Sequence, residues 1–275
     1  MTVVKPHTRA TEKLVYYYLK CRDNPAIKQS IENEYGVSIS LNSIQELKEV
    51  CWEYRGIFFP NNINNPDELS QNSWFDMFSD RIGINVKWGI ESTANSRIRD
   101  LTKGAVEDIN EIIRNDSKLG VKNAFSYDQF RNSILRTISE KIRCKNFPIK
   151  IDNDIRVYLK LAYLVCMSFL GGENKNRDVF FINFTTDFHS SIHRVASPYT
   201  SFNVQKFVKD VGIEFSTNQI GDPHKQTIKY FIKKSPIGFL ELRSNGRAML
   251  HLRKTENHWA NLFKNFDQYK ILVKF

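Results

Sequence analysis

The sequence has little of what marks disulfide-rich, membrane-spanning or low-complexity proteins. Among its 275 residues are only 4 Cys, 12 Gly and 8 Pro, which argues against collagen, repeat arrays and disordered tails. The cysteines show no Cys-x-x-Cys spacing, so neither a zinc knuckle nor a disulfide scaffold is expected. No apolar run approaches the roughly 20 residues of a transmembrane helix. The start also lacks the apolar core of a secretory signal, so we expect a cytoplasmic protein without a membrane partner.

Glycine-rich phosphate loops of the GxGxxG or GxxxxGK[ST] type are absent from the sequence, so no nucleotide cofactor is expected. Positive charge, by contrast, is abundant: 40 Lys and Arg against 30 Asp and Glu leave a net charge of +10. Such a surplus attracts polyanions, and nucleic acid is the leading partner that it predicts. The alternative is a basic surface with no polyanionic partner.

The N-terminal region shows three successive helical patterns between Thr8 and about Gly56. Thr11 is placed to cap the first helix. In the second, AIKQSIENEY, the residues Ile27, Ile31 and Tyr35 share one stripe, and Gly36 ends the helix. The third begins after VSIS and completes a predicted helical module over residues 1–58.

Within this module, IKQSIENEYGVSISLNSIQELKEV resembles the helix-turn-helix of transposases and DNA-binding regulators. Its Gly36 turn is followed by apolar residues that hold the second helix against the core. The resemblance implies that the outward face of that helix reads duplex DNA in the major groove. Its candidate DNA-binding residues are Asn42, Ser43, Gln45 and Lys48. An ordinary helical hairpin is the alternative, and Glu46 and Glu49 favour it because carboxylates repel phosphate.

Residues 57–72 are rich in Asn and Pro, which indicates a linker, so a second domain is predicted over 59–275. Periodicity predicts helices and strands there, with a turn at Ser235–Gly238 whose second residue is Pro236. The expected fold class is α/β (α+β): a mixed β-sheet core flanked by helices, with C-terminal basic β-hairpins. The predicted helices are 103–113, 127–142 and 153–170, and the predicted strands and hairpins lie at 81–88, 179–184, 227–234 and 239–254.

The segment NSWFDMFSDRIGINVKWG, residues 72–89, carries the strongest candidate for chemistry. Hydrolysis of a phosphodiester with Mg²⁺ needs carboxylates to hold the metal, and usually a lysine to stabilise the developing charge. Asp76 or Asp80 is the candidate acid. On the following strand, alternation places Asn85 and Lys87 on one face and apolar residues on the other.

This arrangement resembles the PD-(D/E)XK signature of type II restriction endonucleases. The resemblance implies a restriction-endonuclease-like core, a Mg²⁺ cofactor and a homodimer that cleaves double-stranded DNA at a short site. The implied catalytic residues are Asp76, Asp80, Asn85 and Lys87, and the implied metal ligands are Asp76, Asp80 and Glu91. Asn85 departs from the signature, because an amide oxygen binds Mg²⁺ more weakly than the usual carboxylate. Another carboxylate must then compensate, either Glu91 or one of Glu46, Glu49 and Glu53. The alternative is a surface strand with solvated Asp and Lys.

A second candidate, TTDFHSSIHR at 185–194, brings Asp187, His189 and His193 together. If the segment were helical, the two histidines at i and i+4 would be spaced to bind a metal. A polar strand end with exposed histidines is the alternative. Asp187 is the second choice for a metal ligand.

The C-terminal run from Lys225 to Lys254 interleaves basic and aromatic residues. Basic residues on one face of a β-hairpin follow a phosphate backbone, and a β-ribbon fits a major groove. The candidate DNA-binding residues here are Lys229, Lys233, Arg243, Arg247 and Arg253. Two functions therefore remain from the sequence: a Mg²⁺-dependent DNA endonuclease, or a non-enzymatic helix-turn-helix regulator or phage or mobile-element factor.

Overall fold

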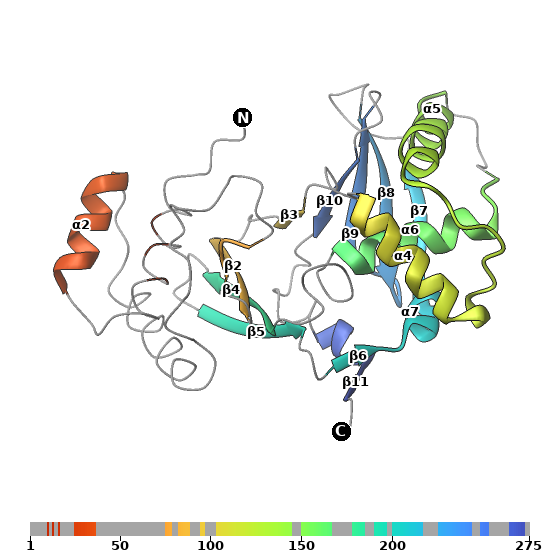
Figure 1. Ribbon diagram of the computed structural model, residues 1–275. Helices are drawn as coiled ribbons and strands as arrows, with labels where there is room; N and C mark the ends of the chain where they lie inside the picture. Colours follow the sequence, from red (N-terminus) through yellow and green to blue (C-terminus); the bar gives the residue numbers. More distant parts are fainter. Residues whose placement is uncertain are drawn as a thin grey trace. The chain divides into compact units, whose positions relative to one another are not determined.

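The computed structural model divides the chain into two units, Met1–Ser92 with Asn176–Pro198 and Thr93–Lys175 with Tyr199–Phe275. Both units contain helices and strands, which confirms the α+β class (Figure 1). The predicted boundary near residue 58 lies outside the described residues. These are 10, 13, 16, 25–36, 75–78, 82–88, 94–96, 103–144, 150–166, 178–184, 190–196, 200–216, 225–243, 248–252 and 264–272.

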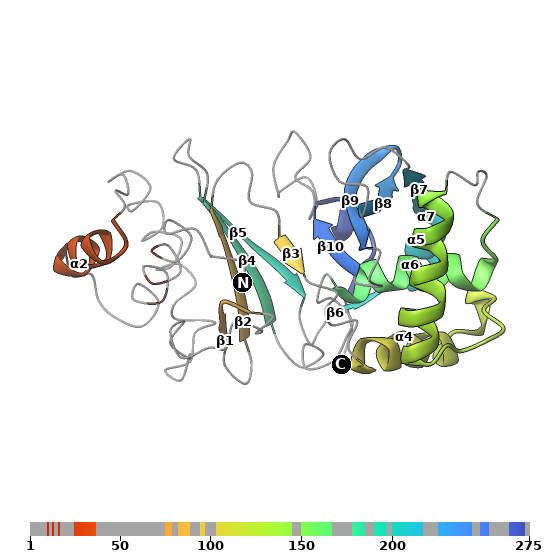
Figure 2. The same cartoon turned by 90° about the horizontal axis from the view of Figure 1, so that it is seen from above.

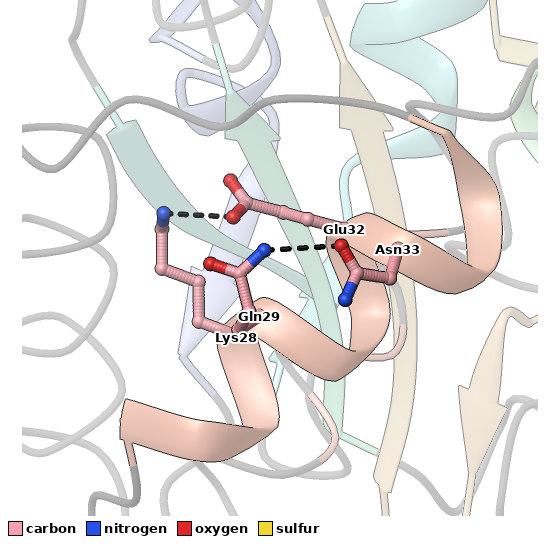
Figure 3. A network of polar contacts seen from close by, with 4 residues as sticks. All are labelled: Lys28, Gln29, Glu32 and Asn33. Carbon is pink, nitrogen blue, oxygen red and sulfur yellow. Dashed lines mark hydrogen bonds and ion pairs between the residues drawn. The ribbon is translucent and has the colours of Figure 1, made fainter.

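Helix α2 (Pro25–Tyr35) belongs to the first unit and confirms the second predicted helix of the N-terminal module. Pro25 stands at its first position, where the missing N–H costs no helical hydrogen bond. Gly36 ends the helix with φ +61°, a left-handed conformation that favours glycine. Along the helix, Lys28 pairs with Glu32 at 2.9 Å and Gln29 donates to Asn33 at 3.0 Å (Figure 3).

The rest of the predicted N-terminal module is described only in part. Ala10, Lys13 and Tyr16 are helical, as the first pattern predicts. Lys13 forms an ion pair with Glu34 of α2 at 2.7 Å. Residues 37–74, which include the predicted second helix of the helix-turn-helix, lie outside the described residues.

Four strands form the sheet of the first unit, in the order β1-β2-β4-β5. They are β1 (Met77–Phe78), β2 (Ile82–Trp88), β4 (Asp178–Phe184) and β5 (Ser190–Ala196). Strands β2 and β4 run parallel, and the other two pairs are antiparallel, so this sheet is mixed. The strands predicted at 81–88 and 179–184 are therefore confirmed.

Gly83 of β2 lies against the ring of Phe75, which is buried. Because a Cβ at position 83 would overlap that ring, Gly83→Ala is expected to lower the free energy of unfolding by about 1–3 kcal/mol, the usual cost of overpacking. Urea denaturation measures the loss. Gly212→Ala is the control, since a Cβ there would meet Phe231 only at 4.0 Å. An equal loss in both variants would contradict the packing argument.

The second unit contains an antiparallel sheet of five strands in the order β3-β10-β9-β8-β7. These are β3 (Ala94–Ser96), β7 (Val211–Ser216), β8 (Lys225–Ile232), β9 (Ser235–Arg243) and β10 (Ala248–Leu252). Alternate residues of β8, Ile228, Tyr230 and Ile232, are buried and define its core face. The predicted C-terminal β-hairpins are confirmed.

The turn between β8 and β9 lies at Lys233–Lys234, with φ +49° and +71°. The predicted turn at Ser235–Gly238 is wrong, because these residues begin β9. Pro236 is tolerated there since it pairs with Phe231 at a register shift in the ladder, where strands accept proline. Two positive φ angles fit a hairpin turn that usually carries Asn-Gly, so the Lys-Lys sequence gives no signal for it.

Three helical segments of the second unit match the predicted ones: α4 (Lys103–Asn115), the π-helix η4 (Gln129–Leu135) continued by α5 (Arg136–Arg143), and α6 (Asn153–Cys166). The 3₁₀ turn η3 (Ser117–Leu119) and helix α7 (Val204–Asp210) were not predicted. A small separate pairing joins β6 (Thr200–Phe202) to β11 (Lys270–Leu272). Among the described residues, no helix is long and apolar enough to cross a membrane.

Helices α5 and α6 lie against one face of the five-stranded sheet (Figures 1 and 2). Two buried tyrosines join α6 to the sheet. Tyr163 donates to the carbonyl oxygen of Ile237 at 2.6 Å, and Tyr230 donates to that of Leu159 at 3.0 Å. Burial raises the pKa of Tyr163 well above its ordinary value, which keeps the hydroxyl protonated as a donor.

Candidate active site

The candidate site lies on the mixed sheet of the first unit, where β1 meets β2. Met77 pairs with Ile84 in the antiparallel register, and the N–H of Asp76 donates to the carbonyl oxygen of Ile84 at 2.9 Å. Asp76 precedes β1, and this hydrogen bond is one residue out of the register of the ladder, so the backbone of Asp76 lies beside Ile84 at a local irregularity. The predicted acid is therefore held next to Ile84, the residue that precedes the predicted amide Asn85.

The burial of this pair is uneven. Asp76 is half-buried, whereas Asn85 is only 8% exposed. On the other face of β2, Ile84 is fully buried. Strand β2 is thus covered on both sides at this point, as expected for an interior strand of the sheet. A buried amide beside a half-buried carboxylate offers oxygen ligands in a partly desolvated setting.

Strand pairing continues the face that carries Asn85 from β2 onto β4 and β5. Directly paired residues in a sheet share a face. Two adjacent rows cross β2, β4 and β5: Lys87–Asn183–Ser191 and Asn85–Phe181–His193. Five of these six positions carry polar or charged residue types.

The opposite face of the same three strands carries mainly apolar residue types. In the rows of Ile84 and Val86 its positions are Ile84, Val86, Phe180, Ile182 and Ile192, together with Arg194, which pairs with Phe180. Phe180 is fully buried, as Ile84 is. One side of the sheet is therefore mainly apolar, and the other carries most of the polar candidates.

Strands β2 and β5, which come from two segments that the sequence presents as separate candidates, thus contribute residues to one face of one sheet. Strand β5 contains His193, so the i, i+4 histidine pair that a helix would provide does not form. Asn183 and Ser191 were missed by sequence reasoning, because VFFINF was interpreted only as an apolar strand. Alternation within that run, which puts Asn183 on the face opposite Ile182, is the signal for its position.

Few of the predicted metal ligands are among the described residues. Asp80, Glu91 and Asp187, and the alternatives Glu46, Glu49 and Glu53, lie outside the described residues. In the part of the chain that the structure describes, no three His, Cys, Asp or Glu residues are grouped to hold a metal ion. Asp76 and Asn85 provide one carboxylate and one amide. This pair fits Mg²⁺, which often takes only one or two protein carboxylates and completes its shell with water and substrate phosphates.

Acidic residues lie close to some of the predicted DNA-binding residues of the hairpins and partly compensate their positive charge. Lys229 is half-buried on β8 and lies opposite Glu214 of β7 in the ladder. Glu241, on the same face, is 7% exposed. Lys233 is exposed at the turn, and Arg243 ends β9. The remaining candidates, Arg247, Arg253, Asn42, Ser43, Gln45 and Lys48, lie outside the described residues.

Shifted ionisable groups in the second unit have structural roles. Tyr158 accepts from the N–H of Phe125 at 2.8 Å and donates to Asn110, whose amide donates to the carbonyl oxygen of Phe125 at 2.9 Å. Burial raises the pKa of Tyr158. Burial, and then the charge of Arg156, lowers the pKa of Lys160, which donates to the carbonyl oxygen of Val208 at 2.5 Å. These contacts join α6 to α4, to the segment at Phe125 and to α7.

Comparison with known proteins gives no match, since no family model fits the sequence and no curated protein or solved structure is significantly similar to it. The function must therefore be argued from the site itself.

Proposed function

We propose that the protein is a Mg²⁺-dependent endonuclease that hydrolyses phosphodiester bonds in double-stranded DNA, in the manner of a type II restriction enzyme. The supporting observation is that the N–H of Asp76 donates to the carbonyl oxygen of Ile84 on β2, the strand that also carries Asn85 and, two positions further along, Lys87. This brings the backbone of a candidate acid to the strand that carries the candidate lysine. The net charge of +10 supports a polyanionic substrate.

In this proposal each residue has a separate role. Asp76 supplies the carboxylate that binds the metal, and Asn85 supplies a neutral oxygen beside it. When bound, Mg²⁺ lowers the pKa of a water molecule and neutralises charge on the phosphate oxygens. Lys87 stabilises the negative charge that develops on the phosphate. The Asn and Ser types at 183 and 191 are ones that commonly donate hydrogen bonds to DNA phosphates.

Cleavage of both strands at a short palindromic site is achieved most simply by a homodimer, because a two-fold axis relates the two halves of the site. The proposal therefore includes a dimer on DNA. Sedimentation of the protein with and without a cleaved duplex measures this state.

The variant Lys87→Ala tests the proposed role of this lysine in cleavage. The rate of DNA cleavage is expected to fall by about 100-fold or more, the usual cost of removing one group that stabilises transition-state charge. Binding of duplex DNA in EDTA should change by less than about twofold, because one phosphate contact contributes little to affinity. Lys118→Ala, an exposed lysine of the second unit, is the control. Normal cleavage by Lys87→Ala, or an equal loss in the control, would contradict the assignment.

The second candidate function is a DNA-binding regulator without chemistry. It is favoured by the end of α2, where Gly36 adopts a left-handed conformation that ends the helix at the position of the predicted turn. A regulator would retard a specific duplex on a gel while leaving it intact with every divalent metal. The endonuclease would produce discrete, metal-dependent fragments.

A further inference from the structure

One continuous helix of the second unit, η4 followed by α5, presents a buried face and a basic face. Its buried residues are Phe130, Ile134, Leu135, Ile138, Ser139 and Ile142. Four exposed cations lie on the remaining surface: Arg131, Arg136, Lys141 and Arg143. The exposed acids of the same helix are Asp128 and Glu140. The helix is therefore amphipathic, with its apolar side already used in the core.

The π-helix aligns three of these cations. Arg136 and Arg143 are seven residues apart, which is two turns of an α-helix, so they lie on one stripe, and the exposed Glu140 lies between them. Arg131 is five residues before Arg136. In a regular α-helix the two side chains would point to different sides of the helix. Because a π-helix joins residues five apart by hydrogen bonds, η4 brings Arg131 onto the same stripe. We call Arg131, Arg136 and Arg143 the arginine stripe.

The charges of this stripe are available to a partner. Within the described part of the chain, no ion pair involves Arg136, Lys141 or Arg143. The guanidinium of Arg131 donates to the hydroxyl of Tyr127 at 3.2 Å and lies 5.8 Å from the centre of its ring. A neutral tyrosine leaves the charge of Arg131 uncompensated while restricting its position.

A lipid surface fits this helix poorly as a partner. Helices that bind membrane interfaces insert an exposed apolar face beside their cations. Here that face packs into the core, and Ile271 on β11 is the one large hydrophobic residue exposed among the described residues. The exposed neutral residues between the cations are small and polar, including Asn132, Ser133 and Thr137. Side chains of these types commonly donate hydrogen bonds to phosphate oxygens.

We propose that the arginine stripe binds the phosphate backbone of duplex DNA. This inference rests on the proposed function for its choice of polyanion, and it adds a helix of the second unit to the DNA contacts that the sequence predicted for the hairpins and the helix-turn-helix. The stripe spans about 18 Å at 1.5 Å per residue. Arginine is suited to the contact because its planar donors bind phosphate in pairs.

The test measures binding of a fluorescent 30-base-pair duplex by anisotropy in EDTA, so that cleavage plays no part. Arg131→Gln/Arg136→Gln/Arg143→Gln is compared with Lys118→Gln/Lys122→Gln/Lys150→Gln, which removes the same charge from other exposed positions of the second unit. The arginine variant is expected to bind at least about 10-fold more weakly at 100 mM salt. Its slope of log K against log salt should fall by about 2 to 3, at 0.9 per phosphate contact. The control should bind within about twofold of the wild type.

Circular dichroism and thermal melting check that both variants fold. Equal weakening by both triple variants would overturn the proposal, since it would show a diffuse effect of net charge. Unchanged binding by the arginine variant would overturn it as well, and so would stripe-dependent binding to vesicles with 30% phosphatidylserine but not to DNA. If the wild type binds the duplex through the stripe yet never cleaves it with Mg²⁺, this inference stands and the endonuclease proposal fails.

Discussion

Replacing Asp76 with Asn is expected to reduce metal-dependent DNA cleavage by about 1,000-fold or more. In our proposal this residue supplies the one carboxylate among the described residues of the site, and its neighbour Asn85 offers only a neutral oxygen. A second amide in place of that carboxylate would leave the metal with no negative ligand from this pair. Metal-ion stabilisation of the transition state amounts to several kcal/mol, and each 1.36 kcal/mol changes the rate tenfold.

Single-turnover cleavage of a labelled duplex measures this effect. Asp76→Asn should still bind that duplex in EDTA within about twofold of the wild type, because the lost charge is negative and repels phosphate. Asp128→Asn removes the same charge from an exposed position of the second unit and should cleave normally. Undiminished cleavage by Asp76→Asn would exclude this residue as a metal ligand.

The largest expected effect on stability comes from Asp154, in the first turn of α6. This side chain is 9% exposed, and its carboxylate accepts the backbone N–H of Lys122 at 3.2 Å and that of Asn123 at 3.1 Å. Hydrogen bonds to a charged group contribute about 1.5–3 kcal/mol each. Asp154→Ala is therefore expected to lower the free energy of unfolding by about 3 kcal/mol.

In urea denaturation, this loss should lower the urea concentration at the midpoint of the unfolding transition. Asp154→Asn keeps one carbonyl oxygen and should lose less than the alanine variant. Asp128→Ala is the control, since Asp128 is exposed and makes no side-chain capping hydrogen bond. Its free energy of unfolding should change by less than about 0.5 kcal/mol. If Asp154→Ala is no less stable than Asp128→Ala, the carboxylate does not anchor residues 121–126.

Local periodicity predicted most of the elements that the structure describes. The apolar stripe of α2 and its end at Gly36 follow from residue spacing and from the tolerance of glycine for positive φ. The turn at Lys233–Lys234 could not be found in this way, because its backbone conformation contradicts the usual preference of lysine. The π conformation of η4 was likewise not predicted, since the sequence pattern indicated an ordinary helix there.

The candidate site was predictable in part. The hydrogen bond from Asp76 to Ile84 joins segments that are close in the chain, so sequence spacing was sufficient to bring the candidate acid to β2. The alignment of Lys87 with Asn183 and Ser191 involves parallel pairing of strands nearly a hundred residues apart. No local pattern encodes that register, because it is set by the apolar residues that share the other face of the sheet. The arginine stripe was missed for a similar reason: an α-helical spacing separates Arg131 from Arg136.

The most direct test of the endonuclease proposal is incubation of the purified protein with unmethylated phage and plasmid DNA at low salt. Parallel samples contain Mg²⁺, Mn²⁺ or EDTA. Discrete fragments with either metal, and intact DNA in EDTA, are the result we expect. DNA that is retarded on a gel but remains intact in every sample would contradict the proposal and identify the protein as a DNA-binding factor without this chemistry.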